Sequence, residues 1–336
     1  MSDLILEVRD LVVDIPVATG MLHPVQSISF DVTRGETLCI VGESGCGKSL
    51  TSLAVMDLLP STATCTASVL RLDGEDLQSV GEKRMTDIRG NKMAMIFQEP
   101  MTSLNPAYTI GNQLEEALLR HKNVSSGEAR DRAVYLLEKV GITAAESRLT
   151  QYPHQLSGGL RQRVMIAMAL MCGPELIIAD EPTTALDVTI QAQILHLLAD
   201  LQKEFNMGMI LITHDLGVVA RVADRVAVMY AGEIVETGTA KQVFENPTHP
   251  YTQGLLECIP IPGKTARGSH LGSIPGIVPS LVGDLPGCHF GDRCTYAMDT
   301  CRTGTIGLRD SFEDGHVFRC VLTPEQCAAN LKKGAA

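Results

Sequence analysis

One eight-residue stretch near the start of the chain constrains it more than any other. Residues 42–49 read GESGCGKS, which fits the pattern G-x-x-x-x-G-K-[ST]. A short apolar run, residues 38–41, precedes this stretch, and a helix-like run, residues 50–59, follows it. Glycines let backbone N–H groups turn inward on phosphate oxygens, and a helix presents the positive end of its dipole to them. The sequence therefore predicts a phosphate-binding loop between a strand and a helix, in preference to a chance glycine-rich turn.

The residues of this loop have distinct predicted roles. Lys48 is expected to reach the β- and γ-phosphates of a nucleotide, and Ser49 is expected to ligate Mg²⁺. The remaining nucleotide-binding positions of the loop are Gly42, Glu43, Ser44, Gly45, Cys46 and Gly47.

A second motif places two acids at the end of an apolar strand. Residues 176–181 read LIIADE. A carboxylate at a strand end beside a phosphate loop is placed to hold Mg²⁺, which suits Asp180. Glu181 is then expected to accept a proton from the attacking water or to orient it. The alternative, that two acids merely cap a strand at the surface, loses weight next to a phosphate loop.

Strand-like and helix-like segments alternate up to about residue 240, which favours an α/β architecture. The predicted strands, mostly of the buried parallel kind, are residues 38–41, 93–97, 176–180, 209–213 and 225–230. The predicted helices include residues 110–120, 127–140 and 190–205. Repeated Pro and Gly between residues 260 and 287 indicate a linker. We therefore expect a nucleotide-binding domain over residues 1–245 and a C-terminal extension over residues 246–336.

Length, charge and hydropathy narrow the class of protein. The 336 residues suffice for one large α/β domain with an appendage. A net charge of −11 disfavours nucleic acid as the main partner. The first residues lack the basic stretch and apolar run of a signal peptide, and the longest apolar runs are strand-sized. Any membrane association is therefore expected to come through partner subunits.

A third motif, LSGGLRQR at residues 156–163, lies before the acidic strand. Ser157 alone reads as a helix N-cap, and the spacing of Leu160, Val164, Met168 and Met171 predicts one buried helix face. The order of the phosphate loop, Gln98, this motif and the acidic strand resembles the ABC family of ATPases over essentially the whole chain. That resemblance implies an α/β P-loop NTPase fold of the ABC ATPase type, with a helical subdomain at about residues 98–172 and a small cysteine-containing C-terminal extension.

The resemblance also implies roles for single residues. Gln98 is expected to touch Mg²⁺, to take part in catalysis and to sense a membrane subunit. Ser157 and Gly159 would bind the γ-phosphate of ATP held by an opposite protomer. Asp187 is expected at the dimer interface, and His214 would contact the γ-phosphate as a catalytic switch.

The implied mechanism is a cycle in which two ATP molecules are trapped between two ATPase subunits. Closure of this dimer moves the helical subdomain, which docks on membrane subunits, and hydrolysis allows reopening. One position departs from the family pattern: Ile15 stands where an aromatic residue usually stacks on adenine.

Two further stretches are similar to one branch of this family. Residues 246–252 read NPTHPYT and residues 101–106 read MTSLNP, as in ATPases of dipeptide, oligopeptide and nickel importers, and the first ATPase subunit of dipeptide importers matches best. This resemblance implies a peripheral protein on the cytoplasmic face of the inner membrane. Its partners would be a second ATPase that is a paralogue of this chain, two permeases and an external solute-binding protein.

Three alternatives remain open on the sequence. In the first alternative, this chain is the ATPase of a related importer whose cargo is nickel or glutathione rather than peptide. A soluble ABC protein of translation or DNA repair is disfavoured, because the chain has one core and no heptad stretch. A regulatory subunit that binds ATP without hydrolysing it is disfavoured by the presence of Lys48, Asp180, Glu181 and His214.

Four of the ten cysteines cluster between residues 288 and 320 of the C-terminal extension, at Cys288, Cys294, Cys301 and Cys320, and the other six, Cys327 among them, are interpreted as ordinary thiols. The four clustered cysteines contain no C-x-x-C pair, so their spacing is weak evidence for zinc, and free buried thiols are the plain alternative. The pattern resembles the tail of peptide-importer ATPases in which four thiolates hold a [4Fe–4S] cluster. The resemblance thus implies a structural or redox-sensing cluster in addition to ATP and Mg²⁺.

Overall fold

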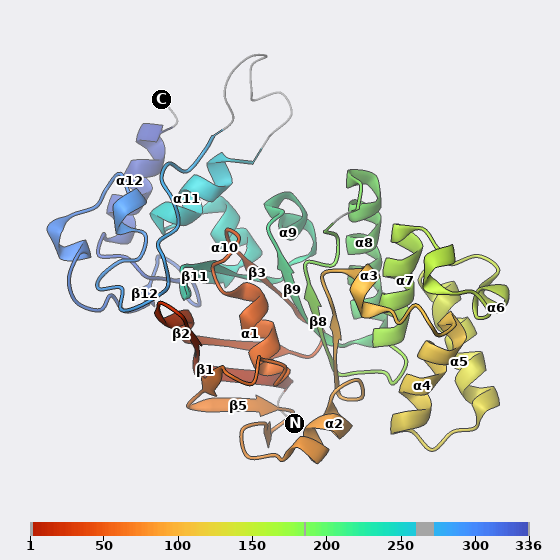
Figure 1. Ribbon diagram of the computed structural model, residues 1–336. Coiled ribbons are helices and arrows are strands. Elements are labelled where there is room, and N and C mark those ends of the chain that lie inside the picture. The colour runs from red at the N-terminus through yellow and green to blue at the C-terminus, as the bar shows by residue number, and fades with distance from the viewer. Residues whose placement is uncertain (1–2, 185, 260–271, 335–336) are drawn as a thin grey trace. The chain divides into compact units, whose positions relative to one another are not determined.

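The computed structural model describes residues 3–184, 186–259 and 272–334 (Figure 1). The chain divides into two compact units. Unit 1 comprises residues 1–7, 31–37 and 71–212, and unit 2 comprises residues 8–30, 38–70 and 213–336. Part of the predicted linker, residues 260–271, lies outside the described residues.

The central strands of unit 1 are parallel and buried on both faces. They are β7 (Met93–Ile96), β8 (Leu176–Asp180) and β9 (Gly208–Thr213), with β8 in the middle. Every residue of β8 and β9 is buried, which is why these segments are continuous apolar runs in the sequence rather than alternating ones. The predicted strands at 93–97, 176–180 and 209–213 are confirmed to within one residue.

The helices of unit 1 include the predicted pair at residues 110–120 and 127–140. Helix α4 starts after Thr109, whose side chain accepts the Asn112 N–H, and α5 starts with a capping box between Ser125 and Glu128. Both pack on α7 (Figure 1, yellow to green). The helices are α2 (Glu82–Ile88), α3 (Pro100–Ser103), α4 (Ile110–His121), α5 (Ser126–Lys139), α6 (Ala145–Arg148), η1 (Pro153–Gln155), α7 (Gly158–Ala169) and α8 (Val188–Phe205).

Helix α7 is buried on more than the one predicted face. Val164 and Met171 of that face are buried and Leu160 and Met168 are half-buried, but Gln162 and Met165 outside it are also buried, at 1% and 3% exposed. The reason is that α3, α4, α5 and β7 all pack on this helix, so that it is enclosed on several sides.

Unit 2 holds the phosphate loop and the C-terminal extension. β10 (Arg225–Tyr230) pairs in parallel with β3 (Thr37–Val41) and antiparallel with β11 (Glu233–Thr239). Two short strands of the extension, β13 (Val317–Phe318) and β12 (Arg309–Asp310), continue outward from β11. The extension therefore contributes strands of its own to the sheet that carries the phosphate loop.

The helix after the phosphate loop, α1 (Lys48–Val55), is shorter than the predicted run of residues 50–59. Asp57 has a φ of 52°, a left-handed conformation that an α-helix cannot contain, and Pro60 follows soon after. The apolar residues beyond Val55 thus belong to a turn.

The remaining elements complete the described chain. A separate antiparallel sheet has the order β2-β1-β5-β6, with β4 paired to β1. Its strands are β1 (Leu4–Val17), β2 (Gly20–Thr33), β4 (Thr64–Thr66), β5 (Val69–Leu72) and β6 (Glu75–Asp76). The other helices are α9 (Leu216–Val222), α10 (Ala240–Glu245), α11 (Pro250–Glu257), η2 (Gly291–Arg293), η3 (Asp299–Cys301) and α12 (Pro324–Gly334). Within the described ranges, none of these helices has the length and apolar character that crossing a membrane requires.

A buried carboxylate fastens residues 246–252 and the extension to β11. Glu236 is fully buried, and its two oxygens accept the backbone N–H groups of Thr248 at 2.7 Å and His249 at 2.8 Å. Nε2 of His316, in the extension, lies 2.7 Å from Glu236 Oε1. The NPTHPYT stretch is therefore held in place by Glu236, which lies ten residues before it, and this carboxylate also contacts His316 far downstream.

Candidate nucleotide site

The phosphate loop is shaped by glycines that no other residue could replace without moving the backbone. Gly47 has a φ of 104°, and a Cβ on it would lie 2.0 Å from the Pro24 carbonyl oxygen. A Cβ on Gly42 would lie 2.1 Å from the carbonyl oxygen of Met229. The loop is thus pressed against β2 and β10, while Gly45 at its tip has open space around it. This packing leaves the backbone amides of the loop to face a phosphate.

Lys48 is placed for the predicted contact with phosphates. The residue is 4% exposed, and its Nζ donates to the carbonyl oxygens of Gly42 at 2.9 Å and Glu43 at 3.0 Å. The ammonium group therefore lies inside the curve of the loop. Ser49, the predicted Mg²⁺ ligand, follows in the first turn of α1, and Cys46 is a fully buried thiol whose pKa burial raises.

The acidic pair stands at the end of β8 in unit 1, as the sequence predicts. Asp180 is the last strand residue and is 5% exposed. Glu181 follows with a φ of 43°, an uncommon left-handed conformation of the kind that clusters at functional sites. Its Oε2 accepts from Gln98 Nε2 at 3.2 Å and from the Thr184 hydroxyl at 2.9 Å. The structure thus brings together Gln98 and Glu181, and it adds Thr184, which the sequence reasoning missed.

The predicted γ-phosphate residues of the LSGG motif lie at the start of α7. Ser157 is exposed and caps the helix, because its hydroxyl accepts the Leu160 N–H at 3.4 Å. A Cβ on Gly159 would lie 3.2 Å from Ile190 Cγ2 on α8. Asp187 caps α8 by accepting the Ile190 N–H at 3.1 Å. Ser157, Gly159 and Asp187 therefore share one region of unit 1.

His214 follows β9 and belongs to unit 2 with the phosphate loop. Its side chain is exposed, and the next residue, Asp215, caps α9 through the N–H groups of Gly217 and Val218. The polypeptide therefore turns sharply into a helix directly after His214, which presents the imidazole at the carboxyl end of the strand.

The sequence reasoning missed two residues that hold the phosphate loop from the C-terminal part of unit 2. The hydroxyl of Tyr251 accepts the Glu43 N–H at 2.9 Å, and the guanidinium of Arg293 is paired with the Glu43 carboxylate. Tyr251 lies in the NPTHPYT stretch, so the motif contained a signal. No sequence pattern pointed to Arg293, apart from its position next to Cys294.

The four clustered cysteines between residues 288 and 320 line one small cavity. Cys288, Cys294, Cys301 and Cys320 surround a space of about 10 Å³ together with apolar side chains such as Leu322. Burial, and then the charges of Cys320, Cys294 and Cys301, raises the pKa of the Cys288 thiol to about 12. Burial likewise raises the pKa of Cys294 to about 11. The thiols are therefore near enough to repel one another when ionised.

Two observations qualify the predicted iron–sulfur site. In the described part of the chain, no group of three or more His, Cys, Asp or Glu residues has the geometry to hold a single metal ion. A space of about 10 Å³ accommodates roughly one water, so a larger group requires the walls to move apart. Cys327, which the sequence reasoning treated as ordinary, is fully buried beside Cys320, and its hydrogen bond lowers the pKa of Cys320 to about 7.

Two family models match the chain. Residues 25–184 match the model described as ABC transporter. Residues 235–301 match the model described as oligopeptide/dipeptide transporter, C-terminal region.

Characterised relatives are similar over nearly the whole chain. The dipeptide transport ATP-binding protein DppD of Bacillus subtilis is 49% identical over 99% of this chain and 98% of its own length. The oligopeptide transport ATP-binding protein AppD of the same organism is 52% identical over 90% of this chain and 92% of its own. Among solved structures, a dimeric post-hydrolysis state of the ATP-binding cassette MJ0796 bound to ADP and Pi is 26% identical. It has a TM-score of 0.62 and covers 70% of this chain and 98% of its own.

Proposed function

We propose that this chain, which belongs to the ABC transporter family of peptide-transport ATP-binding proteins, hydrolyses ATP to power the import of dipeptides or oligopeptides. The observation that carries the proposal is the phosphate loop with Lys48 inside its curve, in a chain that matches a dipeptide transport ATP-binding protein from end to end. The predicted α/β P-loop fold of the ABC ATPase type is confirmed by the family match and by the likeness to a solved cassette.

The C-terminal match favours peptide as cargo. Residues 235–301 match a region described for oligopeptide and dipeptide transporters. This supports the peptide branch over a nickel or glutathione importer and over a soluble ABC protein of translation or DNA repair. The presence of Lys48, Asp180 and Glu181, which supply the groups that ATP hydrolysis needs, in turn supports hydrolysis over mere ATP binding.

The residues of the site divide the work of ATP hydrolysis. The backbone amides of residues 42–49 and Lys48 would bind the phosphates, and Ser49, Asp180 and Gln98 would hold Mg²⁺, which would neutralise charge on the phosphates. Glu181 orients the attacking water and accepts its proton. Its contact with Gln98 Nε2 at 3.2 Å fixes the carboxylate in place.

The rest of the site comes from a second subunit. Ser157 is exposed at the start of α7 and Asp187 is exposed at the start of α8, so both are available to an opposite protomer. Ser157 and Gly159 bind the γ-phosphate of the partner's ATP, Asp187 lies at the dimer interface, and His214 contacts the γ-phosphate of its own ATP. The helical subdomain at about residues 98–172 docks on the permeases.

The assembly around the chain follows from its family. The partner ATPase is a paralogue, and the two subunits act with two permeases and an external solute-binding protein. The chain lies on the cytoplasmic face of the inner membrane as a peripheral protein. The relatives that support this assembly carry names of peptide transport ATP-binding proteins.

Cys288, Cys294, Cys301 and Cys320 would together hold a [4Fe–4S] cluster. The donor set fits, because four cysteines line one cavity and thiolates are the ligands of such clusters. Burial raises the pKa values of Cys288 and Cys294, which disfavours free thiolates there, and ligation to iron would offset that penalty. The cluster has a structural or redox-sensing role and no part in ATP hydrolysis.

Uptake by cells that lack this chain tests the function. The cells receive wild type, Glu181→Gln or Glu245→Gln, the last being the same change at an exposed acid of α10. Uptake of a labelled dipeptide restored by wild type and Glu245→Gln but not by Glu181→Gln supports the proposal. Unchanged uptake of dipeptide, longer peptide and nickel in cells without the chain would remove the peptide-importer assignment.

Iron and sulfide analysis tests the cluster. After anaerobic reconstitution, the full chain is expected to carry about four iron atoms and about four sulfides. Cys301→Ser is expected to lower both, whereas Cys65→Ser, a change at an exposed cysteine, leaves them unaltered. Equal iron content in the two variants contradicts the cluster.

A further inference from the structure

Glu43 is the one acid inside the phosphate loop, and three residues hold it. Tyr251 accepts its backbone N–H at 2.9 Å, and Lys48 donates to its carbonyl oxygen at 3.0 Å. Arg293 binds both oxygens of its side chain, with Nη1 2.5 Å from Oε2 and Nη2 3.0 Å from Oε1. The residue whose carbonyl oxygen receives Lys48 is therefore held at its backbone N–H and at its carboxylate by two side chains from the C-terminal part of unit 2.

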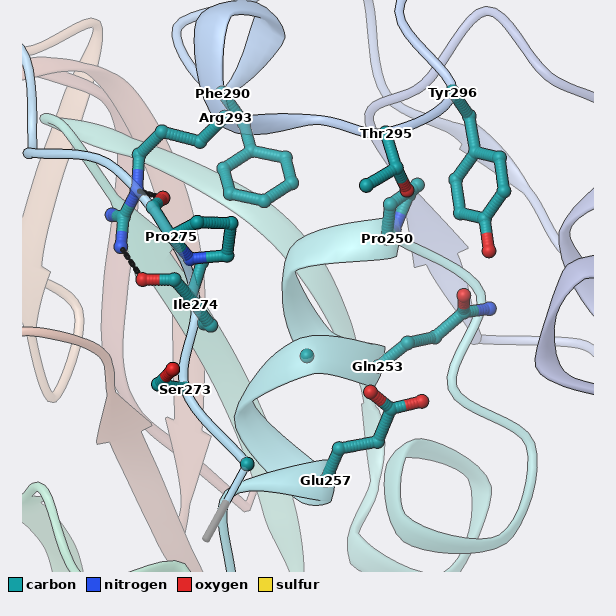
Figure 2. Close-up of a pocket in the computed structure, with 12 residues that line it drawn as sticks. Pro250, Gln253, Glu257, Ser273, Ile274, Pro275, Phe290, Arg293, Thr295 and Tyr296 are labelled. Atoms are coloured by element: carbon teal, nitrogen blue, oxygen red, sulfur yellow. Dashed lines mark hydrogen bonds between the residues drawn. The ribbon is translucent and has the colours of Figure 1, made fainter. Parts of the chain in front are cut away.

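Arg293 is built into its place. Its side chain is 4% exposed, whereas that of Glu43 is 29% exposed. Nε donates to the Pro275 carbonyl at 2.9 Å and Nη2 to the Ile274 carbonyl at 3.2 Å (Figure 2). These bonds leave the outer edge of the guanidinium aimed at Glu43, in the bidentate arrangement that arginine forms with carboxylates.

Aromatic rings complete the setting of this arginine. The guanidinium lies over the Tyr230 ring at 5.7 Å and the Phe290 ring at 6.0 Å. Tyr230 in turn packs on Tyr251 with ring centroids 4.6 Å apart. The same cluster therefore fixes both Arg293 and the tyrosine that binds the Glu43 backbone.

An acid in this loop is at odds with the loop's task. Phosphate binding depends on N–H dipoles and positive charge, and a carboxylate a few residues from Lys48 opposes both. A buried guanidinium paired with that carboxylate cancels its charge in a setting where water screens poorly.

We propose that Arg293 is a positioning residue for ATP: from the C-terminal extension it neutralises and orients Glu43, so that the phosphate loop is ready for nucleotide. This inference rests on the proposed ATPase function and adds to it a residue outside the phosphate loop. An arginine that only anchors the extension would affect folding stability but not the dependence of activity on ATP.

The test measures ATP hydrolysis by the purified transporter complex over a range of ATP concentrations. Arg293→Gln is expected to raise KM for ATP about tenfold with kcat within about twofold, since one uncompensated charge near the phosphates opposes binding. Adding Glu43→Gln removes that charge and is expected to restore KM to within about threefold of wild type. Arg302→Gln, at a 67% exposed arginine of the same extension, is the matched control.

The outcomes separate the possibilities. If KM is unchanged in Arg293→Gln, or rises without rescue by Glu43→Gln, the positioning role is wrong. If Arg293→Gln does not accumulate as folded protein, Arg293→Lys replaces it; its single-point contact is expected to raise KM about threefold, again suppressed by Glu43→Gln. An unchanged KM in Arg293→Lys overturns the proposal in that case. A wild-type complex without ATPase activity would instead refute the proposed function itself.

Discussion

Glu236→Gln is expected to loosen the attachment of the extension to β11. The fully buried carboxylate accepts two backbone N–H groups and lies 2.7 Å from His316 Nε2. Glutamine has the same shape but only one acceptor oxygen, so either orientation of its amide points an NH₂ group at a backbone N–H. One buried donor is thereby left without an acceptor, and the other bonds lose their charge-assisted strength.

The expected loss of unfolding free energy is about 1–3 kcal/mol, the range for leaving a buried hydrogen-bond donor without an acceptor. Urea denaturation of the full chain measures it, and limited proteolysis shows whether residues after 245 become accessible first. Glu245→Gln makes the same change at an exposed site and is expected to stay within about 0.5 kcal/mol of wild type. A Glu236→Gln variant as stable as this control would refute the reasoning.

Three further predictions concern the loop, pH and adenine. Gly47→Ala is expected to abolish ATP binding, because its Cβ would lie 2.0 Å from the Pro24 carbonyl oxygen. Gly45→Ala meets open space but is strained by a φ of 81°, so it is expected to bind ATP more weakly than wild type and more tightly than Gly47→Ala; equal binding by both variants contradicts the packing. Burial lowers the pKa of His249 to about 3, so the unfolded chain takes up a proton below about pH 6.5 that the folded chain refuses. The free energy of unfolding should therefore fall by about 2 kcal/mol between about pH 7 and pH 5 because of this residue. His249→Asn keeps an acceptor for the Tyr251 N–H, and denaturation curves of this variant should show a smaller fall. Ile15→Tyr is expected to tighten ATP binding about fivefold by stacking on adenine, as titration with a fluorescent nucleotide would show, and unchanged affinity would mean that adenine lies elsewhere.

The sequence revealed most of what depends on local patterns. Buried parallel strands are continuous apolar runs, so residues 176–180 and 225–230 were predicted with their exact bounds. The phosphate loop was predictable because glycines and a lysine at fixed spacing have few other uses. The acids after β8 followed from their place at a strand end.

What the sequence did not reveal depends on contacts between distant residues. Arg293 and Glu43 are 250 positions apart, and His316 and Glu236 are 80 apart, so no window of the sequence contains either pair. The helix after the loop was predicted too long, because the left-handed turn at Asp57 interrupts an otherwise apolar run. Helix α7 is buried beyond its one predicted face for a similar reason, since tertiary packing rather than periodicity decides how many sides of a helix are covered.

The pairing of Arg293 with Glu43 has a consequence for exchanging parts between transport ATPases. Consider a chimaera that joins residues 1–245 of this chain to the tail of an unrelated cassette. It keeps Glu43 in its phosphate loop but loses Arg293, which pairs with that carboxylate. Such a hybrid should gain from Glu43→Gln, whereas the intact chain should not. The tail and the phosphate loop must therefore be exchanged together, although 250 positions of sequence separate Glu43 from Arg293.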